Sequence, residues 1–213
     1  MRSILLIAAF SAILMSSASA QSSWSQHTYP DKNFAVSFPA EPKVSTAPYT
    51  AADGTKTTKV TYTVRQADAL YEASYIDLTK SKIDAAAAID QVVKDLSSKG
   101  EVSYNQAARQ NGTCGRYITL KGKDGSTSTN SIFFRDNKLY HIQGTSLPVK
   151  GGDSNSGYMI LFTNSFIFDI TLPFRGDCFG TPADFFTNRN PGTTLGGGNP
   201  DGTTGPRVPT KNF

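Results

Sequence analysis

The chain has 213 residues, of which 18% are charged, and a formal net charge of +4. Its lysines and arginines are scattered rather than clustered, which argues against binding to nucleic acid or another polyanion. The charged fraction lies below the usual quarter or so of a soluble domain, while Ser, Thr, Asn and Gly are plentiful. This composition favours an exported β-rich protein over a cytosolic enzyme.

Residues 1–20 have the features of a secretory signal peptide. Arg2 supplies a positive charge, an apolar run extends from Ile4 to Met15, and Ala18-Ser19-Ala20 is a small-x-small cleavage site. The apolar run is too short for a typical membrane span, and no later stretch approaches its length. We therefore expect a mature chain that begins at Gln21, is periplasmic or secreted, and contains no integral membrane segment.

The segments that follow alternate apolar and polar residues with the period of β-strands. The sequence predicts strands at Ser23–Tyr29, Asn33–Pro39, Thr57–Arg65 and Leu70–Leu78. The last two are expected to form a hairpin through residues 66–69. The intervening segment Ala40–Tyr49 contains two prolines and is predicted to be extended or irregular.

The period then changes to that of a helix over Lys82–Lys99. Ser81 and Asp84 have the spacing of a capping box at its start, and Gly100 is a normal helix stop. An apolar stripe runs along one side of this helix, formed by Ala85 or Ala86, Ile89, Val92, Val93 and Leu96. We expect the stripe to pack on a sheet.

The rest of the ordered chain is predicted to be two strands, a hairpin, a second helix and a final strand. Strands Glu101–Arg109 and Gly115–Lys121 flank an Asn-Gly turn, and a polar connection at Gly122–Ser128 leads into a hairpin at Ser131–Thr145. A shorter helix is expected at Gly157–Ser165. Phe166, Phe168 and Ile170 alternate as in a final strand.

We expect the hairpin at residues 131–145 to lie at the centre of the sheet. A two-residue Asp136-Asn137 turn sets the register, which puts Ile132, Phe134, Leu139 and His141 on one face and Phe133, Tyr140 and Ile142 on the other. Bulky apolar residues on both faces indicate a central position covered on both sides. We expect the two helices to provide that cover.

The order of elements predicts an α+β fold with a mainly antiparallel sheet and helices segregated onto its faces. We expect one domain at residues 21–175. From residue 176 to residue 213 the chain is rich in Gly, Pro and Thr, which is typical of a flexible tail.

The sequence contains two cysteines, Cys114 and Cys178. In an oxidising compartment they can form one disulfide, closing a loop of about 65 residues and contributing roughly 4 kcal/mol in the chain-entropy model. The alternative is two unpaired thiols. Neither cysteine belongs to a CxxC motif, so catalytic use of a thiol is not expected.

Five pieces of the chain, in this order and spacing, resemble the PsbP-like fold family. They are Trp24–Pro42, Tyr71–Leu78 with the helix after it, Gly112–Arg116, the Arg135–Ile142 hairpin and Phe162–Phe166. The family includes bacterial secreted proteins and lipoproteins, the PsbP subunit of photosystem II and a yeast regulator of the nuclear-transport GTPase Ran. The resemblance covers residues 24–168 and implies an α/β/α sandwich around an antiparallel sheet. It implies no activity, because the roles of the family members differ.

The candidate site residues are few. The sequence has two histidines, of which His27 is expected to be exposed and His141 to be a hydrogen-bonded core or rim residue. Arg116 could bind an anion at the rim of the sheet, although an ion pair with a nearby carboxylate is the commoner role. No zinc signature or catalytic motif occurs, so we predict no catalytic residue, no metal ligand and no cofactor.

These observations predict a non-enzymatic exported domain that binds or scaffolds another component of the cell envelope. Its partner is expected to be another envelope protein, with residues 176–213 as a tether or contact segment, and its oligomeric state is left open. The alternative is a periplasmic hydrolase or small-ligand-binding protein with a pocket at the end of the sheet, near Arg116 and His141.

Overall fold

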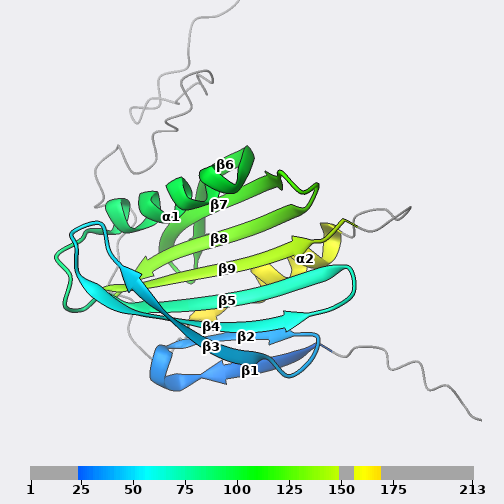
Figure 1. Cartoon of the computed structure of the whole chain (residues 1–213). Helices are drawn as coiled ribbons and strands as arrows, with labels where there is room; N and C mark the ends of the chain where they lie inside the picture. Colours follow the sequence, from blue (N-terminus) through cyan, green and yellow to red (C-terminus); the bar gives the residue numbers. More distant parts are fainter. Residues whose placement is uncertain (1–23, 149–155, 169–213) are drawn as a thin grey trace, which may run out of the picture.

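The computed structural model describes residues 24–148 and 156–168, which form two antiparallel sheets and two α-helices. The larger sheet has seven strands in the order β3-β4-β5-β9-β8-β7-β6 (Figure 1). These strands are β3 (Lys43–Thr50), β4 (Lys56–Arg65), β5 (Ala69–Asp77), β6 (Gly100–Gln110), β7 (Thr113–Gly122), β8 (Thr127–Arg135) and β9 (Lys138–Ser146). The predicted sheet-rich α+β class is confirmed.

The β8–β9 hairpin lies inside the large sheet and has the predicted register. Arg135 pairs with Lys138, and Ile132 pairs with His141. The two turn residues, Asp136 and Asn137, have φ values of 51° and 55°. Such left-handed values at both positions are what a two-residue type I′ turn requires, and Asp and Asn tolerate them better than most residues.

One face of the large sheet is covered by α1 (Ala85–Lys99). The helix buries its apolar side on β6, β7 and β8 (Figure 1). The core on this face is formed by Ile76, Leu78, Ile83, Ala88, Ile89, Val92, Leu96, Ile118, Leu120, Ile132 and Leu139. The predicted apolar stripe of this helix is therefore its contact with the sheet.

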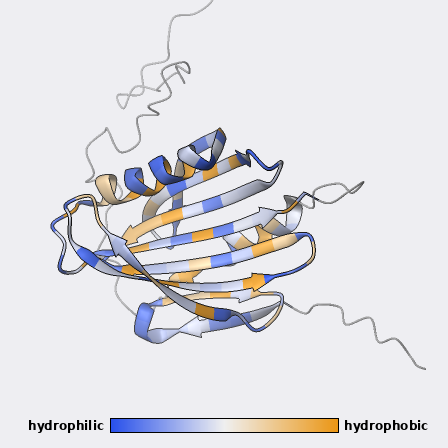
Figure 2. Cartoon of the chain, in the orientation of Figure 1, coloured by the Kyte–Doolittle hydropathy of each residue, from blue (hydrophilic) through white to orange (hydrophobic). Residues whose placement is uncertain are grey.

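The opposite face is covered by α2 (Ser156–Asn164) and by a small sheet in the order β1-β2-β10. The small sheet consists of β1 (Ser25–Tyr29), β2 (Phe34–Phe38) and β10 (Ile167–Phe168), with the 3₁₀ turn η1 (Pro30–Lys32) between β1 and β2. Aromatic rings dominate this second core, including Phe34, Phe38, Tyr71, Phe133, Tyr140, Phe162, Phe166 and Phe168. Figure 2 shows the alternation of hydrophobic and hydrophilic residues along the strands that separates the two faces.

The helix α2 approaches the sheet closely because Gly144 has no side chain. A Cβ atom at Gly144 would lie 2.9 Å from the Cα atom of Met159 in α2. Real Cβ atoms do not come this close to backbone, so the glycine sets the distance between α2 and β9.

The segment Ala40–Tyr49, predicted to be extended or irregular, is extended over most of its length. Residues from Lys43 onward form β3, which pairs with β4 along its whole length, with Pro48 opposite Thr58. Because β3 is an edge strand, one side of its backbone needs no hydrogen bonds from the sheet, and a proline is tolerated there.

The predicted capping box of α1 is also wrong. The helix begins one turn later than expected, and Asp84 is its N-cap: the Asp84 Oδ1 atom accepts a hydrogen bond from the backbone N–H of Ala87 at 2.8 Å. The Ser81 hydroxyl instead donates to Asp53 Oδ2 in the β3–β4 turn, at 2.6 Å. The helix ends at Lys99 as predicted.

Gly100, however, is extended, with φ −177°, rather than left-handed as in a common helix stop. A Cβ atom there would lie 2.2 Å from the Lys121 carbonyl oxygen. The glycine is therefore required by the close pairing of β6 with β7.

The predicted signal peptide at residues 1–20, the predicted tail at residues 176–213 and Ile170 lie outside the described residues. In the part of the chain that the structure describes, no helix is both long enough and apolar enough to cross a membrane.

Candidate functional site: a polar pocket beside helix α1

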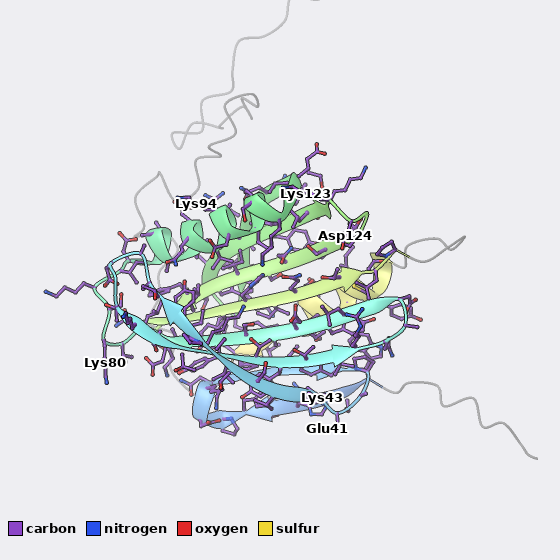
Figure 3. The ribbon with its side chains drawn as sticks, viewed as in Figure 1. Glu41, Lys43, Lys80, Lys94, Lys123 and Asp124 are labelled. Carbon is purple, nitrogen blue, oxygen red and sulfur yellow. The ribbon has the colours of Figure 1, made fainter. Side chains whose placement is uncertain are left out.

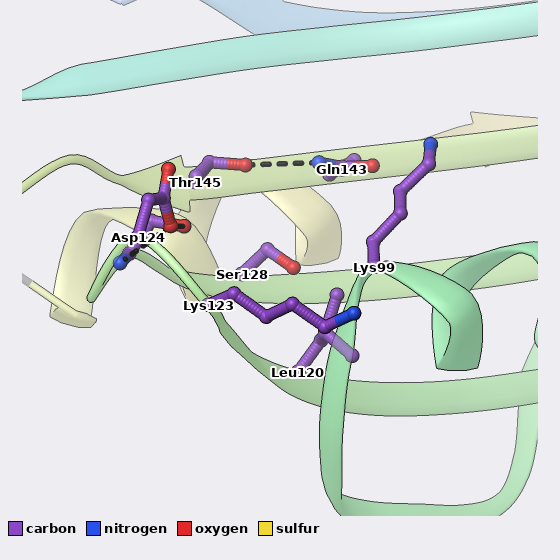
Figure 4. A pocket seen from close by; sticks show the side chains of 9 residues that line it. Lys99, Leu120, Lys123, Asp124, Ser128, Gln143 and Thr145 are labelled. Carbon is purple, nitrogen blue, oxygen red and sulfur yellow. Dashed lines mark hydrogen bonds between the residues drawn. The ribbon is translucent and has the colours of Figure 1, made fainter.

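A polar pocket of about 330 Å³ lies where α1 ends and no longer covers the sheet (Figure 4). Three parts of the chain meet there: the end of α1, the β7–β8 connection, and the second half of β9. The lining residues are Lys99, Leu120, Gly122, Lys123, Asp124, Ser126, Ser128, Gln143 and Thr145. Figure 3 shows that Lys123 and Asp124 lie at the outer end of the β7–β8 connection.

The β7–β8 turn is held in one shape by its own polar groups. Asp124 Oδ1 accepts hydrogen bonds from the backbone N–H and the hydroxyl of Ser126, at 3.0 and 2.6 Å. These bonds lower the pKa of the Asp124 carboxyl below its usual value. The Lys123 ammonium donates to the carbonyl oxygen of Ser98 near the end of α1 at 3.4 Å, which places the lysine beside the pocket.

A chain of hydrogen bonds runs from His141 to the pocket through Asn130, whose side chain is completely buried. Asn130 Nδ2 donates to the Ile118 carbonyl oxygen at 3.4 Å and to Ser128 Oγ at 3.0 Å. Because a carbonyl oxygen can only accept, these contacts fix the orientation of the amide. Asn130 Oδ1 then lies 2.9 Å from His141 Nε2, so that nitrogen carries the proton.

The half-buried His141 is neutral at physiological pH. The pKa of His141 is lowered from 6.5 to about 3, mainly by burial and to a smaller extent by the positive charges of Lys59 on β4 and Lys99 on α1. The ring therefore acts as a neutral hydrogen-bond donor to Asn130. This agrees with the prediction of a hydrogen-bonded rim histidine.

The other two candidates, Arg116 and His27, differ from the predictions. The Arg116 guanidinium donates to the amide oxygen of Asn105 at 3.3 Å, not to the expected carboxylate. His27 is half-buried rather than exposed, with its ring edge-on to Phe38 at 5.7 Å between centroids.

The structure does not bring Arg116 and His141 together. Both are paired with Ile132, on opposite sides of β8. Two strand spacings separate their backbones by about 10 Å. Neither residue lines the pocket beside α1.

Cys114 is the second residue of β7, is half-buried and packs at the edge of the core under α1. The described part of the chain contains no free cysteine. Its predicted partner, Cys178, lies outside the described residues, so the disulfide stays a prediction.

A second surface feature is the outer face of α2. Tyr158, Ile160 and Leu161 are 45%, 43% and 60% exposed, respectively. Trp24 at the start of β1 stacks on the Tyr158 ring at 6.4 Å between centroids. We refer to Tyr158, Ile160 and Leu161 as the α2 outer face.

The sequence interpretation missed the pocket, because it treated Gly122–Ser128 as no more than a polar connection. A signal was present in β8, where Ser128 and Asn130 occupy positions that alternation assigns to the same buried face as Ile132. Within residues 24–148 and 156–168, no group of three or more His, Cys, Asp or Glu side chains could hold a metal ion.

Comparison with known proteins gives little further information. No family model matches the chain, and no curated protein matches it. Among solved structures, PA94, a protein of unknown function from Pseudomonas aeruginosa, is similar with a TM-score of 0.34 and 8% sequence identity. The match covers 59% of this chain and 83% of that chain. A likeness this weak carries no argument about fold or function.

Proposed function

We propose that the chain is an exported, non-enzymatic PsbP-like domain that binds or scaffolds another protein of the cell envelope. The layered arrangement supports the PsbP-like part of the proposal: α1 lies on one face of an antiparallel sheet, and α2 lies on the other (Figure 1). The export signal at residues 1–20 supports the location. The binding role rests on the α2 outer face.

The α2 outer face is the observation that carries the binding role. The segment from Tyr158 to Phe162 is apolar throughout, and the helix buries Met159 and Phe162 against the sheet. A helix that is apolar all round is normally covered on all sides. Here three large apolar side chains of one short helix remain about half exposed to solvent, which is typical of a protein contact surface.

A separate protein suits this surface better than the chain's own C-terminal segment. The described chain ends at Phe168, whose backbone N–H donates to Asn111 Oδ1 in the β6–β7 turn at 3.1 Å. Cys114 follows three residues after Asn111, on the side of the sheet that α1 covers. The predicted bond between Cys114 and Cys178 would join residue 178 to β7, on the face of the sheet that α1 covers.

Site-specific photo-crosslinking in the producing cell tests the proposal. A photoreactive residue replaces Leu161 in the full chain, and a matched control replaces Lys94, which lies on the outer side of α1 (Figure 3). We expect one discrete adduct with an envelope protein from position 161 and none from position 94. Equal labelling from both positions, or an adduct with a second copy of the chain, would contradict the assignment of the surface.

The crosslinked partner is then purified and titrated with the wild-type chain and with the Leu161→Ser variant. Removing a large apolar side chain from the buried centre of an interface costs about 1.5–3 kcal/mol, so the affinity should fall roughly ten- to a hundredfold. Since Leu161 is a surface residue, the variant should keep its thermal stability. An unchanged affinity would show that the α2 outer face is not the contact.

A further inference from the structure

We infer that the pocket beside α1 binds a small molecule through an oxyanion, a carboxylate or phosphate group, held by Lys99, Lys123 and the hydroxyls of Ser128 and Thr145. This site is separate from the α2 outer face and does not depend on the proposed protein partner. The two lie on opposite faces of the large sheet, since Lys99 belongs to α1.

The hydroxyl groups of the pocket are set to donate. Ser128 Oγ accepts a hydrogen bond from Asn130 Nδ2, so its own proton is left for another acceptor. Thr145 Oγ1 accepts a hydrogen bond from Gln143 Nε2 at 3.0 Å, so its proton is likewise left for another acceptor (Figure 4). A hydroxyl whose lone pair is already occupied acts toward a ligand as an O–H donor.

The charges of the pocket also favour an anion. Lys99 extends from the end of α1 toward β9, and Lys123 extends from the β7–β8 turn (Figure 4). Within the described residues neither ammonium forms an ion pair with a carboxylate. In the one carboxylate of the lining, Asp124, the Oδ1 atom accepts from the N–H and the hydroxyl of Ser126, which leaves one negative charge against the two lysines. Donors and cations therefore outnumber free acceptors.

Cationic groups repel one another next to the pocket when no anion is present. Lys99 lowers the pKa of Lys59 and the pKa of His141, in addition to the larger effect of burial on each. Glu72, whose effect exceeds that of Lys99, and Asp95 raise the pKa of Lys59. A bound anion would relieve this repulsion, and its attraction to the lysines would be screened by salt.

The volume sets the size of the ligand. A pocket of about 330 Å³ is at the lower end of small-molecule sites. It is large enough for a monosaccharide that carries one anionic group, with Gln143 and the turn hydroxyl of Ser126 available to neutral polar groups. Carboxylate and phosphate share the recognition chemistry, and a titration can distinguish them.

The test is a titration of the full mature chain, labelled with ¹⁵N, with glucose 6-phosphate, glucuronate and glucose. We expect at least one of the two anions to shift the amide signals of Ser128, Gln143 and Thr145, while neutral glucose does not. A response to the phosphate alone or the carboxylate alone identifies the preferred group. Equal binding of glucose, or no saturable shift with either anion up to about 20 mM, would overturn the inference.

Three variants locate the binding. A hydrogen bond to a charged group is worth about a factor of ten or more, so Lys123→Gln and Lys99→Gln should each weaken anion binding roughly tenfold. Lys94→Gln, on the outer side of the same helix, should leave it unchanged. A loss of equal size in Lys94→Gln would mean unspecific attraction and would contradict the site.

Removal of the Ser128 hydroxyl in Ser128→Ala should weaken binding by a smaller factor without changing its salt dependence. The Leu161→Ser variant should bind the anion as the wild type does. This last comparison keeps failure of the anion site distinguishable from failure of the protein contact.

Discussion

The stability of the domain should fall between pH 7 and pH 5 because of His141. In the unfolded chain the histidine has a pKa of about 6.5, and in the folded chain its pKa is lowered to about 3. Between these values the unfolded state binds a proton that the folded state does not. Above pH 6.5 His141 therefore makes its full contribution to the free energy of unfolding. This contribution decreases as the pH falls toward 3.

The size of the effect follows from the two pKa values. Each pH unit inside the window changes the free energy of unfolding by about 1.4 kcal/mol. From pH 6.5 to pH 5 the loss is about 2 kcal/mol, which lowers the urea midpoint by roughly 1 M for a domain of this size. The groups whose charges act on the ring are cationic, namely Lys59 on β4 and Lys99 on α1.

Urea unfolding at pH 7 and pH 5 measures the effect on the wild type and two variants. His141→Gln keeps a donor for Asn130 but does not titrate, so its loss between the two pH values should be smaller by about 2 kcal/mol. His27→Gln is the matched control and should lose as much as the wild type. The carboxyls of Asp53, Asp77 and Asp124 also have lowered pKa values in the folded chain, but their contribution is lost mainly as the pH falls through the unfolded value of about 4, below both pH values of the assay. Equal losses in His141→Gln and wild type would refute the reasoning.

Three further changes test the packing. Gly144→Ala should destabilise the fold by about 2 kcal/mol in a thermal melt, because the new Cβ meets Met159 at 2.9 Å, whereas Gly157→Ala, with open space around it, should not. Asp84→Ala removes the N-cap of α1 and should cost about 1 kcal/mol, with Asp90→Ala on the exposed side of the same helix as the control. Replacing both cysteines by serine should cost up to roughly 4 kcal/mol; a melt unaffected by both the replacement and a reductant would reject the Cys114–Cys178 disulfide.

The centre of the fold could be predicted because its determinants are local. Alternation in β8 and β9 specifies which residues share a face, and the Asp136-Asn137 turn fixes the register between them. Both were correct down to the pairing of Ile132 with His141. The helix α1 was predictable for the same reason, since its apolar period of 3.6 is visible within one segment.

The predictions fail where the local structure depends on a contact with residues that are distant in the sequence. The Ser81 hydroxyl would suit a capping box, but Asp53 from the β3–β4 turn binds it, and the helix begins at the next available cap. Pro48 argues against a strand unless the strand lies at an edge, and edge position follows from the sheet order. The pocket required the same knowledge, because α1, β7–β8 and β9 become neighbours only in the folded chain.

The polar residues of β8 connect the fold to the anion site. A central strand covered on both faces is normally rich in Val and Ile, and an apolar pair in place of Asn130 and His141 would avoid burying polar groups at all. The chain instead has a complete set of partners for Asn130, which is the condition under which a buried polar network is tolerated. The last free donor of that network, the Ser128 hydroxyl, lines the pocket. Polar residues thus replace the usual apolar ones in a central strand, and they lead to the wall of a pocket. We expect this of a binding site rather than of a core that serves stability alone.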